Sequence, residues 1–317
     1  MGHVLLRQNV RCGAPCVGAR LEGVGRILIK LVLCDMDGTL KPFGHDRVSP
    51  RSIRAIHELR QAGIEFGPAT GREPVDLYDF FGGDDSCYAT GIMANGKIVD
   101  VDRERVLAKT LDHAALKRLE AFCLGNPDYA LVAYVPAPDE GGRPRARVII
   151  SGTTPEEVEA YTRRTGITLA ATNEIASVPD DEILTAGFAY LGESADAMGE
   201  LRNRLAAAFP EFDFVKPAPS FFDVLPHGWT KASALRVLLQ YLNVSRDEVA
   251  FFGDSENDVA MLRAVGASFA VSNGTRVAQG AARYHIGDAA DDSVAKVMEA
   301  IARSGGELTI PEDALPR

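Results

Sequence analysis

The chain has 317 residues, of which 46% are hydrophobic, and a formal net charge of -10 at pH 7. This length allows one large domain or two moderate ones, and we expect two. The acidic charge argues against a nucleic acid or an anionic membrane as the partner. No apolar run approaches the ~20 residues that a membrane-spanning helix needs. Five cysteines without a pairing pattern, and no recognisable signal peptide, predict reduced thiols in a cytoplasmic protein.

Residues 1–26 differ in composition from the rest of the chain. They carry four arginines and one acidic residue and show no hydrophobic periodicity. Cys12 and Cys16, with His3, could suggest a metal site, but the pair has no second pair to complete it. We therefore expect a disordered N-terminal extension.

The strongest chemical signal is the stretch Leu31–Leu40, LVLCDMDGTL. Its apolar run reads as a buried strand that ends in Asp35 and Asp37, followed by Gly38. In an extended segment these two side chains point the same way, so both can reach one small volume. Two close carboxylates need a positive partner, and a hard divalent cation such as Mg2+ is the usual one. The spacing does not fit an EF-hand, whereas a simple turn with solvated acids stays open as an alternative.

A second motif follows one helix and one strand later. Ser49 is a predicted N-cap for a helix over 50–60, and a strand over 64–69 leads into Thr70-Gly71-Arg72. This βαβ pattern predicts a parallel sheet whose carboxyl edge gathers functional groups. Taken alone, Thr70 could equally be a helix N-cap.

From about residue 87 to residue 216 the pattern changes, because no strand in it ends in a carboxylate motif. The predicted strands cover 87–94, 97–101, 129–135, 145–151, 183–190 and 212–216, and the predicted helices cover 111–125, 154–164 and 194–208. The Pro- and Gly-rich run at 136–144 predicts an exposed hairpin loop. We interpret the whole segment as an α+β module inserted into the first domain, and as a substrate lid.

The sheet pattern resumes after Phe221–Pro226. Thr230 is the predicted N-cap of a helix in which Lys231 occupies the first turn. A cation at that end opposes the helix dipole, so an anion bound at the same corner would explain it, although a solvated surface lysine stays open.

The next apolar strand, 249–252, ends in a second acidic cluster that includes Asp254 and Asp258. Four acidic groups on one sheet edge would repel each other strongly without a metal. A strand over 267–271 and a helix over 292–303 complete the domain, and we expect the tail from residue 305 to be frayed.

The predicted fold class is therefore α/β. We expect a Rossmann-like, three-layer core with a parallel sheet, formed by 27–86 and 217–304. The inserted α+β cap would span 87–216, and a tail would span 305–317.

Four stretches in this order resemble the haloacid dehalogenase-like phosphatase superfamily. They are Asp35–Leu40 (DMDGTL), Ala69–Arg72 (ATGR), Gly228–Leu235 (GWTKASAL) and Gly253–Leu262 (GDSENDVAML). The last two stretches, and the large insert between the second and third, resemble the Cof-type subfamily with a C2-type cap. The resemblance covers residues from about 27 to 300.

The resemblance implies a role for each matching residue. Asp35 would be the nucleophile that forms an aspartyl-phosphate, and Asp37 would act as general acid and then as general base. Mg2+ would be held by the residues Asp35, Asp37 (through its backbone carbonyl), Asp254 and, through water, Asp258. The phosphoryl group would be held and oriented by Thr70, Lys231 and Asn257.

Asp37 distinguishes between activities in this superfamily, because the dehalogenases lack an acid at this position. The resemblance thus implies a Mg2+-dependent phosphomonoester hydrolase acting on a small metabolite such as a sugar phosphate. A phosphomutase or phosphotransferase could use the same aspartyl-phosphate, and a metabolite-binding protein with a silent site is a non-enzymatic alternative. The sequence identifies neither the substrate nor the oligomeric state.

Overall fold

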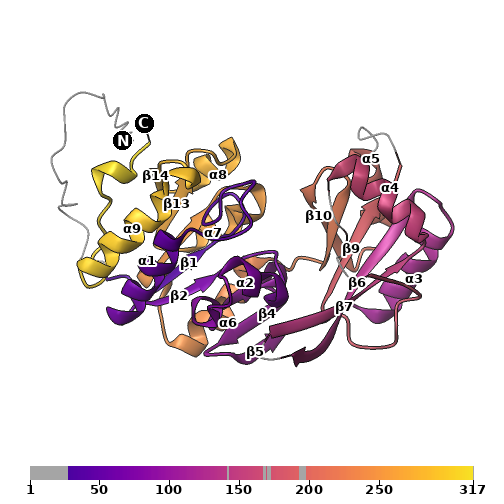
Figure 1. The fold of residues 1–317 in the computed structure, drawn as a ribbon, viewed down its shortest axis with the longest axis horizontal. Helices are drawn as coiled ribbons and strands as arrows, with labels where there is room; N and C mark the ends of the chain where they lie inside the picture. The colour runs from indigo at the N-terminus through magenta and orange to yellow at the C-terminus, as the bar shows by residue number, and fades with distance from the viewer. Residues whose placement is uncertain (1–27, 141–142, 167–168, 170–172, 193–197, 317) are drawn as a thin grey trace, which may run out of the picture.

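The computed structural model describes residues 28–140, 143–166, 169, 173–192 and 198–316. The expected N-terminal extension, with its two cysteines, lies outside these residues. Figure 1 shows two bodies, one built around a five-stranded sheet and one around a six-stranded sheet. In the described ranges no helix is long and apolar enough to cross a membrane.

The first body is built on a parallel sheet in the order β14-β13-β12-β1-β2. Its strands are β1 (Leu31–Cys34), β2 (Glu65–Pro68), β12 (Val249–Gly253), β13 (Ala267–Val271) and β14 (Tyr284–Ile286). β1 lies inside the sheet, with β12 on one side and the edge strand β2 on the other. The two strands that precede the acidic motifs are therefore direct neighbours, and their carboxyl ends meet at one edge.

Helices cover both faces of this sheet, which confirms the predicted three layers. The helices are α1 (Pro50–Gln61), α2 (Pro74–Phe80), α6 (Lys231–Leu242), α7 (Val259–Ala264), α8 (Arg276–Ala281) and α9 (Ser293–Arg303). Alternate residues of β1 serve the two faces: Val32 packs in the cluster that includes α1 and α9, and Leu33 in the cluster that includes α6 and α7. Burial on both faces explains why β1 is continuously apolar.

A small antiparallel sheet extends the first body beside β2. It contains β3 (Gly91–Met93), β4 (Ile98–Val101) and β5 (Glu104–Ala108). Ala69 forms a parallel bridge with Ile92, and the same sheet packs against α6. The region 87–94, predicted as one strand, instead begins with the last two residues of a 3-10 turn (Asp85–Tyr88), and only Gly91–Met93 in it form a strand.

The second body is the predicted cap, a sheet in the order β10-β11-β9-β6-β7-β8. Its elements are β6 (Tyr129–Glu140), β7 (Arg143–Ser151), β8 (Asn173–Ile175), β9 (Thr185–Tyr190), β10 (Phe212–Ala218), β11 (Phe221–Pro226), α3 (His113–Leu124), α4 (Pro155–Thr165) and α5 (Met198–Ala208). Helices α3 and α5 belong to the cluster that contains Leu131, whereas α4 belongs to the cluster that contains Val132. The alternation along β6 thus accounts for both apolar layers of the cap.

Two predictions about irregular segments are wrong. Residues 136–140 and 143–144 are strand rather than loop, because β6 and β7 stay paired as far as Glu140 and Arg143. β-strands tolerate Pro near a sheet edge or a register shift, and this hairpin has such a shift between Ala137 and Glu140. The tail from residue 305 is not frayed either, because Ala314 is buried and its carbonyl accepts the amide of Gly287.

The division into domains remains a proposal, and the sheets suggest where its borders lie. The sheet β3–β5 packs on the core helix α6, so we place the first border near residue 110 rather than at 87. β11 pairs with β9 and β10 in the cap sheet, so we place the return to the core after Pro226 rather than at 216.

The segment that leads from the cap back to the core is short and is held by a hydrogen bond. Only four residues separate the end of β11 at Pro226 from Lys231, the first residue of α6. Among them, Trp229 donates its indole N–H to the carbonyl of Gly96 at 2.8 Å.

Replacing Gly67 with alanine should destabilise the protein by about 1–3 kcal/mol, because a methyl group there overpacks the contact between β2 and β3. A Cβ atom at Gly67 would collide with the carbonyl oxygen of Thr90 and lie 3.0 Å from the Cα of Gly91. Urea unfolding measures the loss. Gly199→Ala is the control, since it lies on α5 with no atom within 4 Å, and it should be neutral or slightly stabilising. Equal stability of the two variants would contradict the close packing described here.

Candidate active site

Two neighbouring strands deliver the acidic residues to one point. Asp35 directly follows β1, and its amide donates to the carbonyl of Phe252 on β12 at 2.9 Å. Asp254 directly follows β12. Both residues are almost fully buried. The carboxyl ends of adjacent parallel strands are where open α/β sheets bind their ligands, so this edge is the candidate site.

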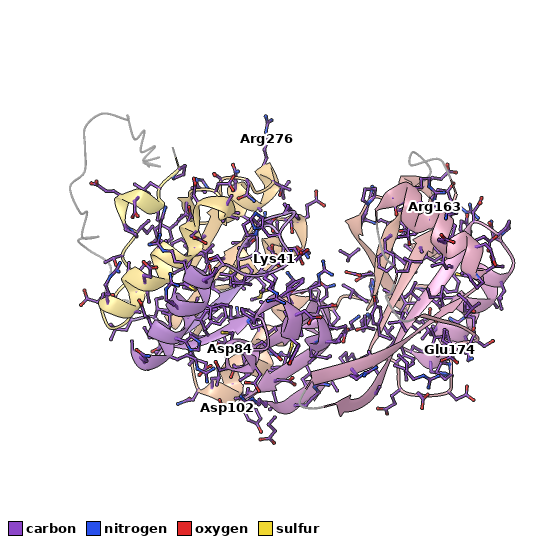
Figure 2. The ribbon with its side chains drawn as sticks, in the orientation of Figure 1. Lys41, Asp84, Asp102, Arg163, Glu174 and Arg276 are labelled. Carbon is purple, nitrogen blue, oxygen red and sulfur yellow. The ribbon has the colours of Figure 1, made fainter. Side chains whose placement is uncertain are left out.

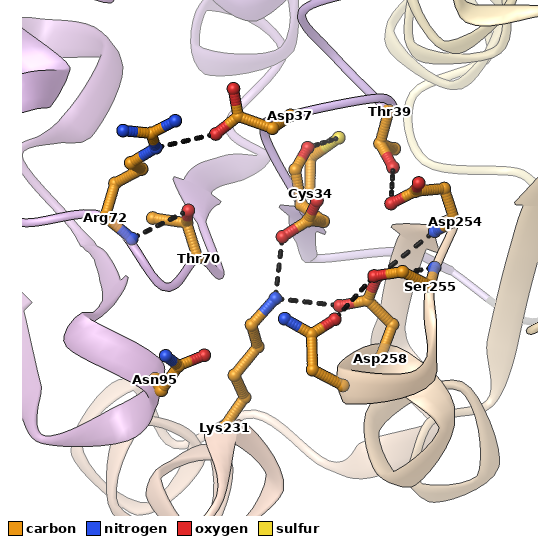
Figure 3. Close-up of polar contacts among 12 residues, drawn as sticks. Cys34, Asp37, Thr39, Thr70, Arg72, Asn95, Lys231, Asp254, Ser255 and Asp258 are labelled. Carbon is orange, nitrogen blue, oxygen red and sulfur yellow. Dashed lines mark hydrogen bonds and ion pairs between the residues drawn. The ribbon is translucent and has the colours of Figure 1, made fainter. Parts of the chain in front are cut away.

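Lys231 connects the carboxylate of Asp35 to a third buried carboxylate, that of Asp258 (Figure 3). Its Nζ lies 2.6 Å from Oδ1 of Asp35 and 2.8 Å from Oδ1 of Asp258. The side chain is 1% exposed, so Lys231 is not a solvated surface lysine. Thr230 is the N-cap of α6, as predicted, and its backbone amide donates to Oγ of Ser233 at 3.2 Å. The unfavourable cation at this helix start is thus explained by the two anions beside it.

Asp258 is held in place by the backbone of the loop that precedes it. Its Oδ2 accepts the amides of Asp254 at 3.1 Å and Ser255 at 3.2 Å, while Oδ1 faces Lys231. The neighbouring Asn257 accepts the hydroxyl of Ser255 at 2.6 Å through its side-chain oxygen. This arrangement leaves the amide nitrogen of Asn257 as a donor for a ligand.

Gly38 is required where the chain leaves the first acidic residues. Its φ of +85° lies in the left-handed region, which other residues rarely adopt. A Cβ atom at this position would lie 2.7 Å from Oδ2 of Asp254 and 2.6 Å from the ring of Phe43. The glycine therefore allows the loop after β1 to approach the carboxylate that follows β12.

Burial and mutual repulsion dominate the electrostatics of the cluster. Burial, and then the charge of Asp258, raise the pKa of Asp35 well above its usual value. The same two causes raise the pKa of Asp254 to about 6. Burial alone would lower the pKa of Lys231, but the carboxylates of Asp258 and Asp35 raise it, so this lysine stays charged. One cation does not balance three carboxylates.

The donor set fits a divalent cation. Asp35, Asp254 and Asp258 each offer a carboxylate oxygen, and these oxygens lie within 4.8 Å of one another. All three residues are buried, and an all-oxygen set suits a hard cation. A buried excess of negative charge is stabilised by a divalent ion, so the cluster can hold a metal. The carboxylate of Asp37 does not belong to this group. The predicted metal ligand at Asp37 is its backbone carbonyl, not its carboxylate.

The side chain of Asp37 turns to two cations instead. Its Oδ1 lies 2.9 Å from Nζ of Lys41 and its Oδ2 lies 2.8 Å from Nε of Arg72. Burial would raise the pKa of this carboxyl, but Arg72 and Lys41 lower it below its usual value. Asp37 and Asp35 thus occupy opposite electrostatic environments only two residues apart.

Thr70 lies at the end of β2, beside Asp37 and Arg72 (Figure 3). Its hydroxyl oxygen accepts the amide of Arg72 at 3.1 Å, which leaves its proton for another acceptor. Two backbone hydrogen bonds fix its position: its amide donates to the carbonyl of Ile92 on β3, and its carbonyl accepts the amide of Asn95 in the segment after β3.

The structure adds residues to the site that sequence patterns did not assign. Asn95 donates to Asp223 on β11 at 2.8 Å, which joins the site to the cap sheet. Burial raises the pKa of Asp223. The sequence patterns also assigned no role to Lys41 or Arg72, although Arg72 belongs to the motif Ala69–Arg72. The signal that could have found them is charge, because Lys41 follows the first acidic motif and Arg72 is the cation in its own motif.

Comparison with known proteins identifies the family of this chain. Residues 32–298 match the family model described as haloacid dehalogenase-like hydrolase. The chain belongs to the haloacid dehalogenase-like hydrolases. Within this family it is a Cof-type phosphatase. Its core sheet and inserted cap sheet match the architecture of the subclass IIB structures.

Similar haloacid dehalogenase-like proteins cover most of the chain at low identity. A putative phosphatase of Haemophilus influenzae is 22% identical over 86% of this chain and 98% of its own length. A 5-amino-6-(5-phospho-D-ribitylamino)uracil phosphatase of Escherichia coli is 24% identical over 87% and 97%. A solved structure of a phosphatase from Bacteroides thetaiotaomicron has a TM-score of 0.68 at 24% identity and covers 90% of this chain and 99% of its own.

Adding Mg2+ to the metal-free protein should raise its melting temperature, because a cation that binds only the folded state stabilises it by about 2.7 kcal/mol at one hundred times its Kd. Asp254→Asn should remove most of this shift. The shift should also be smaller near pH 5 than near pH 7.5, since protons compete for a carboxyl whose pKa is raised to about 6.

Differential scanning fluorimetry measures these shifts. Asp84→Asn is the matched control: it removes a carboxylate from the other described group of possible ligands, His57, Asp84 and Cys87. It should leave the Mg2+ shift unchanged, because a hard cation prefers the all-oxygen cluster. An undiminished Mg2+ shift in the Asp254 variant would contradict the assignment of the cation to the strand-end cluster.

Proposed function

We propose that this chain is a Mg2+-dependent phosphomonoester hydrolase that acts on a small phosphorylated metabolite through an aspartyl-phosphate on Asp35. The observation that carries the proposal is the position of Asp35: it stands at the carboxyl end of β1, close to Nζ of Lys231 and to the carboxylate oxygens of Asp254 and Asp258. On this proposal, a nucleophile, a cation and a metal site share one small volume, as catalysis of phosphoryl transfer requires.

In the first half of the reaction, one oxygen of Asp35 attacks the phosphorus atom and the bond to the leaving oxygen breaks. Lys231 is hydrogen-bonded to Oδ1 of Asp35, so it is placed to hold both the nucleophile and a phosphoryl oxygen. The free hydroxyl proton of Thr70 and the amide of Asn257 are placed to donate to further phosphoryl oxygens. Positioning and charge neutralisation are what phosphoryl transfer chiefly requires of a protein.

In the second half, water attacks the phosphorus atom and Asp35 is released. Asp37 is two residues from Asp35, so it can give a proton to the leaving oxygen first and take one from the attacking water afterwards. When bound, Mg2+ supplies positive charge that balances the carboxylates and the phosphoryl oxygens. Asp35, Asp254 and the backbone carbonyl of Asp37 would hold it, with Asp258 acting through water.

Three observations bear on the substrate. One similar protein is named for a phosphorylated ribitylaminouracil, another, from Yersinia pseudotuberculosis, is an HMP-PP phosphatase, and a third, known from its structure, is described as a sugar phosphatase. All three act on small phosphorylated compounds. We infer the same broad class for this chain, with neither nucleic acid nor a membrane as partner, in a cytoplasmic protein.

Asp35→Asn should preserve the fold but lower kcat at least about a thousandfold, because the amide cannot form the acyl phosphate. Phosphate release from p-nitrophenyl phosphate measures the loss, and urea unfolding verifies the fold. Asp84→Asn, which removes a carboxylate outside the site, should keep its activity. Residual turnover above about one per cent in the Asp35 variant would refute the covalent mechanism.

With a panel of sugar phosphates and other phosphorylated metabolites, we expect Mg2+-dependent release of inorganic phosphate that EDTA abolishes. Each phosphate released should be matched by one dephosphorylated product. Formation of an isomeric phosphosugar without free phosphate would instead identify a mutase. Silence toward the whole panel, with no phosphorylated Asp35 detectable by mass spectrometry, would support the binding protein.

A further inference from the structure

Both oxygens of the Asp37 carboxylate are occupied in the structure. Lys41 takes Oδ1 at 2.9 Å and Arg72 takes Oδ2 at 2.8 Å. The two cations also share a platform, because Nζ of Lys41 lies 4.8 Å, and the guanidinium of Arg72 5.4 Å, from the centre of the Phe80 ring. A carboxylate held in this way cannot reach a leaving group until one contact opens.

The Lys41 contact is the fixed one. Lys41 is 6% exposed, and its Nζ also donates to the carbonyl of His45 at 2.9 Å. Its backbone forms a bridge with Asp37 itself, and its carbonyl accepts the amide of Gly38 at 2.8 Å. The lysine and the carboxylate are therefore parts of one compact turn, and neither can move without the other.

The Arg72 contact differs in exposure. Its backbone is fixed, since the amide donates to Thr70 and the carbonyl accepts Ala94, but its side chain is 47% exposed. Figure 3 shows the guanidinium of Arg72 approaching Asp37 from the opposite side to the chain that carries the carboxylate. A long side chain in solvent can exchange partners at little cost, so the contact to Oδ2 is the one that opens.

We propose that Lys41 is a positioning residue: it holds the Asp37 carboxylate through Oδ1, so that Oδ2 becomes the oxygen that exchanges a proton with the leaving group once Arg72 moves away. This inference rests on the proposed function, and specifically on Asp37 as the general acid and base. It assigns a function to a lysine that lies outside the groups contacting the phosphoryl group.

The proton balance of the cycle closes on one atom. Oδ2 of Asp37 is ionised while Arg72 holds it, so it takes up a proton from solvent as Arg72 withdraws. It gives this proton to the leaving oxygen as that oxygen separates from phosphorus and the bond from Asp35 to phosphorus forms. It then takes a proton from water as the water oxygen binds phosphorus and the bond to Asp35 breaks. Asp37 returns this proton to solvent when Arg72 binds Oδ2 again, so the net reaction is hydrolysis of the ester.

The test compares leaving groups in the full chain. An alkoxide needs a proton as it leaves, whereas p-nitrophenolate does not. Because kcat/KM reports the steps up to formation of the aspartyl-phosphate, Lys41→Met should lower kcat/KM for an alkyl phosphate by 10- to 100-fold, and by at least tenfold more than for p-nitrophenyl phosphate. Lys41→Arg, which keeps the charge, should restore most of the loss for the alkyl ester.

A control and a second variant separate this effect from a change in folding. Lys30→Met removes a lysine whose only described pairing is with Glu248 at the surface, and it should leave both substrates unaffected. Lys41→Gln, which keeps a hydrogen-bond donor, provides a second variant if Lys41→Met unfolds at the assay temperature, and it should show the same split in a weaker form.

An equal loss for both substrates would overturn the inference, because it would show a structural or phosphate-binding role for Lys41. A gain for the alkyl ester would also overturn it, since Lys41 would then only withhold the proton from Asp37. If the wild-type protein hydrolyses neither ester, the proposed function fails. If it hydrolyses both and the Lys41 variants show no split, only the present inference fails.

Discussion

The structure depends on the pairing of one buried lysine with two buried carboxylates. Lys231 lies between Asp35 and Asp258, at hydrogen-bonding distance from each, and all three side chains are almost fully buried. Such a group is stable only while every charge has a partner, since an unpaired buried charge costs several kcal/mol. The central sheet, the start of α6 and the loop before α7 are therefore tied to each other's positions. The same charges that hold these elements together form the chemistry of the site.

The two aspartates of the first motif illustrate how environment divides identical side chains between roles. Asp35 is buried beside other carboxylates, which raises its pKa, while Asp37 lies between two cations, which lower its pKa. Asp35 is still hydrogen-bonded to β12 at the end of the sheet and contacts the acidic cluster, whereas the turn through Gly38 brings Lys41 back beside Asp37. Geometry over a few residues thus gives one carboxylate a partner in Lys231 and the other a partner in Lys41.

Much of the fold, and of the acidic cluster, could be predicted because the controlling signals are local. An apolar strand that ends in aspartate predicts where that aspartate lies, and Lys231 at a helix start predicts a nearby anion. The link between Asn95 and Asp223 could not be predicted in this way, because it joins residues 128 positions apart through the packing of two sheets. The extent of β6 and β7 was also missed: proline and glycine suggested a loop at 136–144, but pairing across the hairpin outweighed those local preferences.

The short return from the cap to α6 has a practical consequence. The chain contains a single tryptophan, and Trp229 lies in the four residues between the last cap strand and Lys231, with its indole bound to the carbonyl of Gly96. Figure 2 shows the side chains of the two bodies that this segment joins. All tryptophan fluorescence of the protein therefore originates at the joint between cap and core. The molecule carries a built-in optical probe of that joint, which can be read without attaching a dye.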